Sequence, residues 1–224
     1  DILGGLLRSL IQRTSFAITA EDARYYLAGA LLVLDKDAAA MVATDGHRLA
    51  WAQKTTTLKV AAEGTRVLVP RKAITELARL IEDMGGQEEG SFHQGEGHLL
   101  FTAGGRTLAS KTVEAQFPAY EKVVGVTGDK KGAVGREVLH SAIRRVSLLS
   151  SERGRAVRLS LEDGRLEVSA SSPELGEARE SLPLEYAGEG VEIGFNAPYL
   201  LDFLAVVGTA EVALEVKDAE SRGI

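Results

Sequence analysis

The chain has 224 residues, of which 45% are hydrophobic, and its formal net charge at pH 7 is −6. This length leaves room for two domains of ordinary size, each with its own core. The sequence has no cysteine, which excludes disulfides and thiolate metal sites. No apolar run approaches the roughly 20 residues of a membrane-spanning helix, and no secretory signal is visible, so we expect a cytoplasmic protein without a membrane partner.

Two stretches of sequence recur in the same order. LLRSLIQRTSF at 6–16 is similar to VLHSAIRRVSL at 138–148, and VLVPRKAITEL from Val67 is similar to EIGFNAPYLLD from Glu192. Two matches in one order, about 130 residues apart, indicate a duplicated unit. We therefore expect two domains of one α+β fold, at 1–125 and 126–224, each with two helices packed on antiparallel sheets.

The first copy is predicted to run from helix to strands and again from helix to strands. Apolar residues at helical spacing predict helices at 1–13 and 70–82, the second ended by Met84, Gly85 and Gly86. A polar turn is expected at 19–24. Alternating apolar residues and turn residues predict strands at 25–34, 40–44, 65–70, 90–93, 98–102 and 107–113, with a hairpin turn at 35–37.

The second copy repeats this order. Helices are predicted at 136–149 and 197–207, and strands at 156–161, 165–170, 191–195 and 211–216, with a hairpin at Asp163 and Gly164. The stretch 125–132 lacks apolar periodicity and is predicted to be a linker. The second copy is expected to lack the last strands of the first.

Charge is unevenly distributed over the predicted elements. The predicted helices carry eight cations, Arg8, Arg13, Arg71, Lys72, Arg79, Arg136, Arg144 and Arg145, against the four acids Asp1, Glu76, Glu137 and Asp202, a net charge of +4. The rest of the chain then carries about −10. Basic helices can contact phosphates without regard to sequence. Charge alone favours the simpler explanation, that Lys and Arg solvate helix surfaces.

The two copies differ after a pair of matching strands. With Val42 aligned to Val168, the first copy continues with ATDGHRLA and the second with SASSPELG. Gly46 permits a tight turn, while His47 and Arg48 can donate hydrogen bonds. Because this is where the copies diverge, we expect function here.

Five segments carry a family resemblance. They are EDARYYL at 21–27 followed by Gly29, VATDGHRLA from Val42, VPRK from Val69, Phe117-Pro118-x-Tyr120, and GFNAPYLLDFL from Gly194. Over its whole length the sequence resembles the bacterial DNA polymerase sliding clamp family, the beta subunit of the replicative polymerase. The resemblance implies two copies of the DNA-clamp fold, with 1–125 as the middle domain and 126–224 as the third domain without its last strands and carboxyl-terminal tail.

The resemblance also implies a processivity factor that is not an enzyme and needs no cofactor or metal. Such a clamp encircles duplex DNA as a head-to-tail homodimer when full length. It tethers the replicative DNA polymerase catalytic subunit, the clamp loader, translesion polymerases and repair proteins. The resemblance and the helix charges together give the DNA-binding candidates Arg24, Tyr25, Tyr26, Arg71, Lys72, Arg79, Arg144 and Arg145. Tyr26 could instead be a core residue of the strand predicted at 25–34.

Partner peptides, by the same resemblance, bind a pocket between the two copies. Its residues would be Leu27, Thr44, Gly46, His47, Arg48, Leu49, Pro118, Lys122, Val123, Asn196 and Tyr199. The apolar members suit aliphatic or aromatic anchors, and the polar members suit the peptide backbone. Lys122 stands where the family often has arginine, Gly154 where some members have a larger apolar residue, and no family tail is present. We therefore expect weaker binding than in an intact clamp.

Two other classes of function remain open at this point. The first is a hydrolase that uses Asp45 and His47 as an acid and base pair. The second is a peptide-binding module without a DNA role. A third group that would complete a triad is not evident, and His93 with His98 lacks further metal ligands at a useful spacing. No phosphate-binding loop with an adjacent Lys and Ser or Thr is present, so nucleotide hydrolysis has no support.

Overall fold

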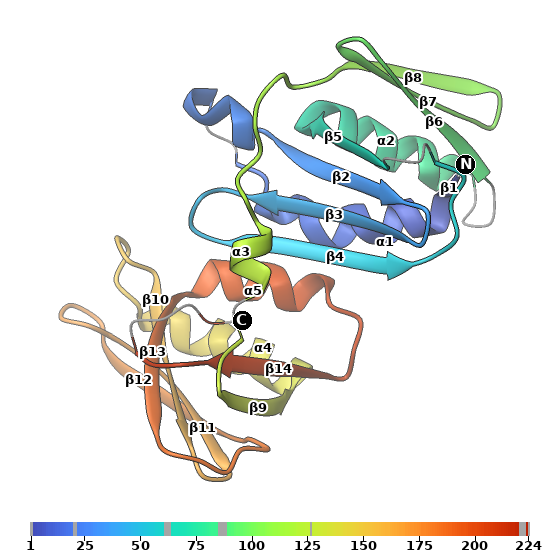
Figure 1. The fold of residues 1–224 in the computed structure, drawn as a ribbon. Helices are drawn as coiled ribbons and strands as arrows, with labels where there is room; N and C mark the ends of the chain where they lie inside the picture. Colours follow the sequence, from blue (N-terminus) through green and yellow to red (C-terminus); the bar gives the residue numbers. More distant parts are fainter. Residues whose placement is uncertain are drawn as a thin grey trace. The chain divides into compact units, whose positions relative to one another are not determined.

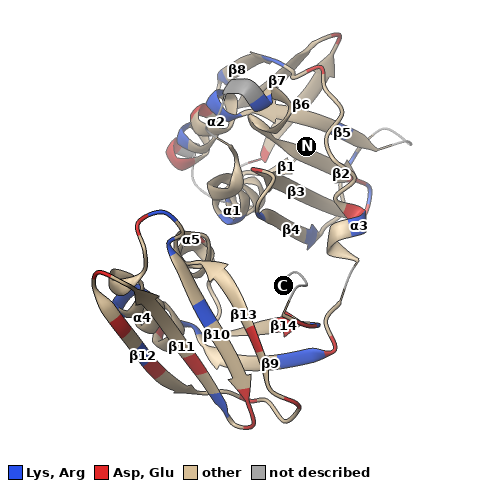
Figure 2. Ribbon diagram, turned by 90° about the vertical axis from the view of Figure 1, so that its left-hand side faces the viewer, with Lys and Arg blue, Asp and Glu red and all other residues tan. Residues whose placement is uncertain are grey.

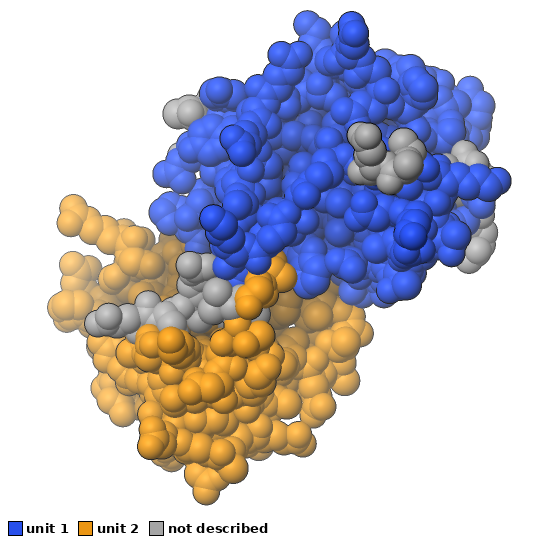
Figure 3. All heavy atoms as spheres, viewed as in Figure 1, with its two compact units in different colours: residues 1–123 blue, residues 124–224 orange. Residues whose placement is uncertain are grey.

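The computed structural model describes residues 2–19, 22–60, 64–84, 89–125, 127–219 and 223, and only the backbone of 22, 23 and 84. The predicted helix stop at Gly85 and Gly86 lies outside the described residues, as do Asp1, Glu21 and Val126. The chain forms two compact units, unit 1 at Asp1–Val123 and unit 2 at Val124–Ile224 (Figure 3). Each unit is described by itself.

Unit 1 combines two four-stranded antiparallel sheets with helices (Figure 1). The first sheet has the order β1-β6-β7-β8, from Ile2–Leu3, Glu89–Gly95, His98–Ala103 and Arg106–Lys111. The second has the order β4-β3-β2-β5, where β2 is Gly29–Asp35, β3 is Ala38–Thr44, β4 is Leu49–Thr55 and β5 is Thr65–Pro70. The helices are α1 at Gly4–Thr14, α2 at Arg71–Met84 and the short α3 at Glu121–Val124, with 3-10 turns η1 at Ser15–Ala17 and η2 at Asp22–Leu27.

The core of unit 1 lies between the two long helices and the sheets. Alternate strand residues, such as Leu32 and Leu34 of β2 and Leu99 and Phe101 of β7, are buried in one apolar cluster with residues of α1 and α2. Leu32 and Met41 from the second sheet, Leu10 from α1, Leu77 from α2 and Phe101 from β7 are each at most 2% exposed. Burial of side chains of this size contributes roughly 1.5–3 kcal/mol each, so this cluster holds the sheets and helices together.

The opposite face of the second sheet, here called the distal face, is also apolar. Leu31, Val33, Ala40 and Val42 are each at most 8% exposed on it. The segment 112–124 runs from β8 to α3 (Figure 1), and its Phe117 and Tyr120 pack against these residues, as does the half-buried Leu49 of β4. Further along β4, Trp51 pairs with Val42 and is 44% exposed. The distal face of unit 1 is therefore a second, smaller core.

Unit 2 has the same plan with a smaller first sheet. Its large sheet has the order β12-β11-β10-β13, from Gly176–Pro183, Arg165–Ser172, Ala156–Glu162 and Val191–Asn196. The two-stranded sheet pairs β14 at Glu211–Val216 with β9 at Lys130–Gly135. The helices are α4 at Arg136–Val146 and α5 at Ala197–Val206, with the 3-10 turn η3 at Ser147–Leu149. Within the described residues, no helix of either unit is long and apolar enough to cross a membrane.

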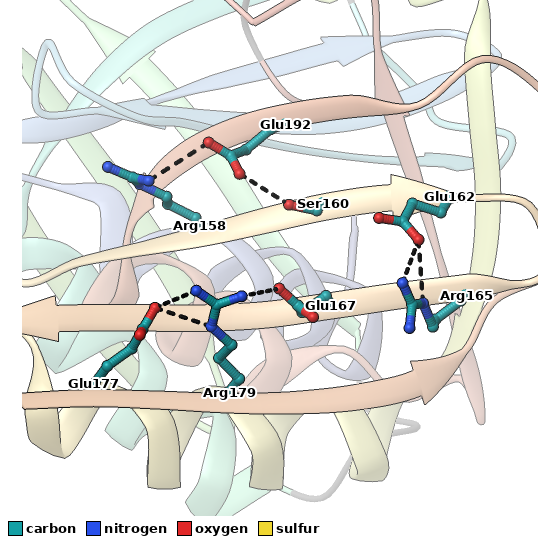
Figure 4. A network of polar contacts seen from close by, with 8 residues as sticks. All are labelled: Arg158, Ser160, Glu162, Arg165, Glu167, Glu177, Arg179 and Glu192. Atoms are coloured by element: carbon teal, nitrogen blue, oxygen red, sulfur yellow. Dashed lines mark hydrogen bonds and ion pairs between the residues drawn. The ribbon is translucent and has the colours of Figure 1, made fainter.

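The distal face of unit 2 is charged. On the side of the large sheet turned away from the core, Arg179 contacts Glu177 and Glu167, and Glu192 contacts Arg158 and Ser160 (Figure 4). Arg165 also pairs with Glu162 across the β10–β11 hairpin (Figure 4). These side chains alternate with buried ones such as Val157, Leu159 and Leu161, so the sheet has one apolar face and one solvated face.

The structure confirms the predicted α+β class and the internal repeat, and it corrects the repeat's register. Leu31 is the third residue of β2, and Arg158 is the third residue of the corresponding strand β10. Leu31 pairs with Val42 and Leu68 in unit 1, and Arg158 pairs with Ser169 and Gly194 in unit 2. Val42 therefore corresponds to Ser169, and the alignment of Val42 with Val168 was wrong by one residue. The pairing of Val67 with Glu192 was wrong by one residue in the same way. A shift of one residue moves a strand residue to the other face, so this correction decides which residues can be compared.

Several predicted boundaries were also wrong. Residues 25–27 belong to η2 and not to a strand, which begins at Gly29. Residues 130–132 lie in β9 and not in a linker, because Lys130–Gly135 pairs along the whole of β14. The strands β1, β4, β9 and β12 and the short helix α3 had not been predicted. The hairpin turn at Asp163 and Gly164 is confirmed, with Gly164 at φ +68°.

Candidate functional site

The turn between β3 and β4 is closed by its own side chains. The Oδ1 atom of Asp45 accepts hydrogen bonds from the backbone N–H groups of His47, at 2.9 Å, and Arg48, at 3.0 Å. Its Oδ2 atom pairs with Nε of Arg48 at 3.1 Å, and both side chains are less than 20% exposed. Both oxygens of the Asp45 carboxylate are thus engaged within the turn. Asp45 acts as a cap and not as an acid or base partner of His47.

Thr44 and Gly46 complete the turn. The buried Thr44 hydroxyl donates to the carbonyl of Arg48 at 2.6 Å and accepts from the N–H of Gly46 at 3.1 Å. Gly46 has φ +90°, a left-handed conformation that favours glycine. A Cβ atom added there would lie 2.7 Å from Nη1 of Arg24. The positive φ therefore favours glycine at this position, whereas the Arg24 guanidinium lies at the end of a flexible side chain and could move aside.

Two contacts, one from Arg24 and one from Arg48 of the turn itself, hold the turn against the rest of unit 1. Arg24 donates from Nη1 to the carbonyl of Asp45 at 2.9 Å. Arg48 donates from Nη2 to the carbonyl of Phe16 at 2.7 Å, and its guanidinium lies 5.2 Å from the centre of the Phe16 ring. The predicted DNA residue Arg24 and the predicted peptide residue Arg48 therefore both support the turn. His47 remains exposed at its tip.

The other predicted peptide residues of unit 1 fall around this turn and on the segment 112–124. Leu27 is 3% exposed and lies beneath Gly46, 3.9 Å from the position of a Cβ atom there. Leu49, Phe117 and Tyr120 all pack against the same buried residues of the distal face. The exposed Pro118 and Lys122 and the half-buried Val123 follow on the segment. The structure thus brings Leu27 and Gly46 together, and it places Leu49 and the segment on one apolar face.

Arg66 on β5 holds the end of this segment. Its Nη2 atom donates to Oε1 of Glu121 at 2.6 Å, and its guanidinium lies 5.7 Å from the centre of the Tyr120 ring. The hydrogen bond from Arg66 lowers the pKa of the Glu121 carboxyl, and the same bond raises the pKa of Arg66. Burial raises the pKa of the Tyr120 hydroxyl. These groups face one another because β5 and the segment run side by side, where Val113 donates to the carbonyl of Leu68 at 3.3 Å.

In unit 2, Asn196 and Tyr199 lie at the start of α5. Asn196 is the N-cap of α5, but its side chain makes no capping hydrogen bond. Its Oδ1 atom is buried and has no hydrogen-bond partner among the described residues. An unpaired buried acceptor costs about 1–3 kcal/mol, so a donor from a bound molecule would be favourable here. Tyr199 is half-buried one turn further along.

The helices are less basic than the count from the sequence. That count omitted Glu82, which lies within the helix predicted at 70–82. Glu82 and Asp83 lie in α2 beside Glu76, so the three cations of this helix are balanced and its net charge is zero. The four helices α1, α2, α4 and α5 carry a net charge of +3, not +4, with the excess on α1 and α4. Figure 2 shows both signs of charge along α2.

Ion pairs divide the predicted DNA-binding residues into two groups. Arg79 pairs with Glu76 at 2.7 Å, and Arg145 makes two hydrogen bonds of 2.6 Å to Glu180. No acid partner is found among the described residues for the exposed side chains of Arg71, Lys72 and Arg144. Tyr25, at 61%, and Tyr26, at 38%, are exposed, and their rings meet edge to face at 5.9 Å. Tyr26 is therefore not a core residue.

The hollows of unit 1 do not add a catalytic site. A hollow of about 470 Å³ lies beside the segment and is lined by Pro118, Phe117, Arg66 and Leu68, among others. A larger one of about 650 Å³, lined by Leu34, Leu58 and Phe92, contains no predicted site residue among its described lining. Across the described parts of both units, no three His, Cys, Asp or Glu residues gather in a way that could hold a metal ion. The arrangement suits binding more than catalysis.

Sequence reasoning missed the residues that support the site. The Asp-Gly pair at 45–46 signals a turn, and Asp is a common cap of such turns, so the role of Asp45 could have been found. Phe117 and Tyr120 belong to a recognised motif but had no assigned role. Phe16 and Arg66 gave no signal, because their contacts depend on how distant segments pack.

Both units match models of one protein family. Residues 2–119 match the model described as DNA polymerase III beta subunit, central domain, and residues 122–223 match that of its C-terminal domain. The chain is 42% identical over 218 residues to the beta sliding clamp of Pseudomonas putida, covering 97% of this chain and 59% of that protein. It is 43% identical to the beta sliding clamp of Pseudomonas aeruginosa over the same shares.

Solved structures give the same result. The crystal structure of the DNA polymerase sliding clamp from Pseudomonas aeruginosa has a TM-score of 0.92 at 42% identity, covering 99% of this chain and 61% of that chain. A sliding clamp from the same organism bound to griselimycin also has a TM-score of 0.92, at 42% identity over 99% of this chain and 59% of that one. The present chain thus spans less than two thirds of the length of these relatives.

Proposed function

The chain belongs to the family of the DNA polymerase III beta subunit, the bacterial beta sliding clamp, and on this premise we propose that it is part of a DNA processivity factor. The whole protein would encircle duplex DNA as a homodimer and tether the replicative polymerase, the clamp loader, translesion polymerases and repair proteins by their clamp-binding motifs. It would not catalyse a reaction itself. The units at Asp1–Val123 and Val124–Ile224 would be its middle and third domains.

One observation carries the peptide-binding part of this proposal. The turn at 44–49 satisfies its hydrogen bonds from within unit 1, through Asp45, Thr44 and Arg24. It therefore presents His47 and Leu49 in a fixed arrangement before any partner arrives, which lowers the entropic cost of binding. The griselimycin-bound relative shows that a clamp of this family takes a ligand.

The remaining residues suit a peptide in two ways. Leu49 and Val123, with Pro118, offer apolar contacts for an aliphatic or aromatic anchor. The unpartnered Oδ1 atom of Asn196 offers an acceptor for a peptide N–H group. We include Tyr199 and Lys122 in the same proposed site. Arg48 and Gly46 contribute by shaping the turn, because the Arg48 guanidinium is already bound to Asp45 and Phe16.

Electrostatics support a DNA-facing role for a subset of the basic residues. Arg71, Lys72 and Arg144 are exposed, and no ion pair is found for them among the described residues. Such cations would contact phosphates and fix no register, which allows sliding. Tyr25 and Tyr26 offer exposed aromatic surface. Arg79 and Arg145 would contribute less, because each is held by a carboxylate.

A peptide titration tests the proposal. A labelled peptide with a clamp-binding motif of the Gln-x-x-Leu-Phe kind should bind the chain, measured by fluorescence anisotropy. Leu49→Asp and Tyr199→Asp should each weaken binding about tenfold, because a charge replaces a contact proposed for the peptide.

Two variants serve as matched controls. Leu100→Asp on β7 and Leu175→Asp in the β11–β12 turn place the same charge at apolar residues that are 38% and 56% exposed and outside the proposed site. They should leave the affinity within about twofold of the wild type, since the peptide does not reach them. Equal affinity for the wild type, Leu49→Asp and Tyr199→Asp would remove the assignment of this pocket.

A further inference from the structure

Arg66 lies on the distal face of unit 1, on a different element from every predicted peptide residue. It makes two contacts with the segment 112–124, a hydrogen bond to Glu121 of 2.6 Å and a stacking contact of 5.7 Å with the Tyr120 ring. We propose that Arg66 is a positioning residue for the peptide site, acting through Tyr120 and Glu121 to fix the segment that carries Pro118, Lys122 and Val123. This inference rests on the peptide-binding function proposed above.

The backbone of the segment transmits the contact directly. Tyr120 donates its N–H to the carbonyl of Pro118 at 2.7 Å, and Val123 donates to the carbonyl of Tyr120 at 2.8 Å. Lys122 donates to the carbonyl of Ala119 at 3.3 Å. The two residues held by Arg66 are therefore hydrogen-bonded or covalent neighbours of all three predicted peptide residues on the segment. A displacement of Tyr120 or Glu121 would move them together.

Little else in the described structure holds this part of the segment. The helix α3 has four residues, none of them buried, and an isolated helix of this length is unstable in water. Phe117 and Tyr120 provide the apolar contact with the distal face, and their rings meet at 6.5 Å. Arg66 provides the polar contact at the other side of Tyr120. With so few contacts, the docking equilibrium of the segment is sensitive to each of them.

The corresponding position in unit 2 has no such role. Arg66 pairs with Val33 across β5 and β2, and Glu192 pairs with Ser160 across β13 and β10, at the same register. Glu192 contacts Arg158 and Ser160 within its own sheet (Figure 4). The arginine of unit 1 instead reaches off the sheet to the segment. The two units thus use one strand position for different purposes.

Charge reversal separates positioning from general stabilisation. Arg66→Glu places two carboxylates together and Glu121→Arg places two cations together, whereas the double variant restores an opposite pair. Arg106→Ala is the matched control, because Arg106 and Asp83 form an ion pair of 2.7 Å in the same unit, at 59% and 58% exposure, away from the segment. Arg66 and Glu121 have similar exposure, 56% and 53%.

The first measurement is hydrogen exchange of the segment without peptide. Exchange reports the opening equilibrium directly, so the amides of Lys122 and Val123 should exchange about fivefold faster in Arg66→Glu and Glu121→Arg. The double variant should return to within about twofold of the wild type, as should Arg106→Ala. The amides of β2 should be unchanged in all of them, which shows that unit 1 stays folded. Unchanged exchange at Lys122 and Val123 in both single variants would overturn the inference.

The second measurement is the peptide titration described above. Lys122 and Val123 move with Tyr120 and Glu121, so we expect each single variant to weaken binding about threefold through their altered placement, with recovery in the double variant. If the wild type does not bind the peptide, the proposed function is overturned. The exchange result would still decide whether Arg66 positions the segment.

If the wild type binds the peptide and each single variant has the same affinity as the wild type, the segment does not contribute to binding. That outcome would overturn the inference alone and leave the proposed function in place.

Discussion

The distal faces of the two large sheets share one register and have opposite chemistry. In unit 1, Leu31, Val42 and Leu49 form an apolar surface under Phe117 and Tyr120. The positions that correspond to them in unit 2 are Arg158, Ser169 and Glu177, as the strand pairing shows. The cores on the other side are alike, with Met41 corresponding to Val168, and both are fully buried. The scaffold was therefore kept while one face was changed.

This difference shows how one face of a repeated fold can hold an additional segment. An apolar distal face can dock a segment of its own chain, as it does here through Phe117 and Tyr120. A charged distal face offers no such contact, since its arginines and glutamates satisfy each other within the sheet (Figure 4). Such exposed pairs contribute little to stability, so the charged face is best understood as a solvated surface.

The largest expected effect comes from exchanging residues between the two faces. Leu31→Arg introduces into unit 1 the residue that unit 2 has at this position, and it should lower the free energy of unfolding by about 3–5 kcal/mol, because it buries a charge without a partner. The reverse change, Arg158→Leu, should alter the free energy of unfolding by at most about 0.5 kcal/mol, because the Arg158 side chain is 65% exposed. Urea denaturation measures both. Equal losses in the free energy of unfolding of the two variants would contradict the difference in burial between the two faces.

The second effect concerns the turns that follow β3 and β11. Asp45→Ala should cost about 2 kcal/mol, because two backbone N–H groups and the Arg48 guanidinium lose a charged acceptor. In unit 2, the Ser172 hydroxyl accepts one hydrogen bond, of 3.3 Å, from the N–H of Glu174. Ser172→Ala should therefore cost less, about 0.5–1 kcal/mol. Thermal unfolding of the two variants compares the caps, and a larger loss for Ser172→Ala would contradict this account of the turn.

The smallest expected effect is a pH dependence of the two carboxylates held by arginine. Hydrogen bonds from Arg66 and Arg145 lower the pKa of Glu121 and of Glu180. Because each folded-state pKa lies below the unfolded value, the stabilisation is present at neutral pH and is lost as the pH falls through the folded-state pKa. NMR titration should find both pKa values below the ordinary value of about 4.3.

Arg66→Ala should return the Glu121 pKa to the ordinary range and leave that of Glu180 unchanged. At low pH the amides of Lys122 and Val123 in unit 1 should also exchange faster, whereas Arg145 and Glu180 hold no such segment in unit 2. A Glu121 pKa that does not respond to Arg66→Ala would mean that this ion pair is absent in solution.

The sequence predicted much of the fold because the strongest signals are local. Helix periodicity gave α4, α5 and most of α1 and α2, and alternation with turn residues gave β5 and β14 at their observed ends. The strand β4 was missed, because Leu49 to Thr55 shows weak alternation and its place at the sheet edge depends on pairing with β3. The register of the repeat was wrong by one residue, because apolar residues on both faces of β3 remove the period-two signal.

The candidate site was predicted less completely than the fold. The family resemblance pointed to the turn at 44–49, and Gly46 signalled its conformation. Capping by Asp45 was not predicted, and an acid and base role with His47 stayed open, because a carboxylate two residues from a histidine fits both readings until the hydrogen bonds are known. The contribution of Arg66 depends on a segment about 55 residues later in the chain that folds back over β5. Local sequence carries no trace of such a contact.

Trp51 gives the molecule an optical probe of its own. It is the one tryptophan in the sequence, it pairs with Val42 on β4, and it lies two residues from Leu49 on the same face of the strand. At 44% exposure its emission should respond to changes in local polarity, so events on the distal face of unit 1 can be followed without a label. Because the chain has no cysteine, a single cysteine introduced into the segment 112–124 could carry an acceptor dye. Energy transfer from Trp51 to that dye would then report the distance between Trp51 and the segment.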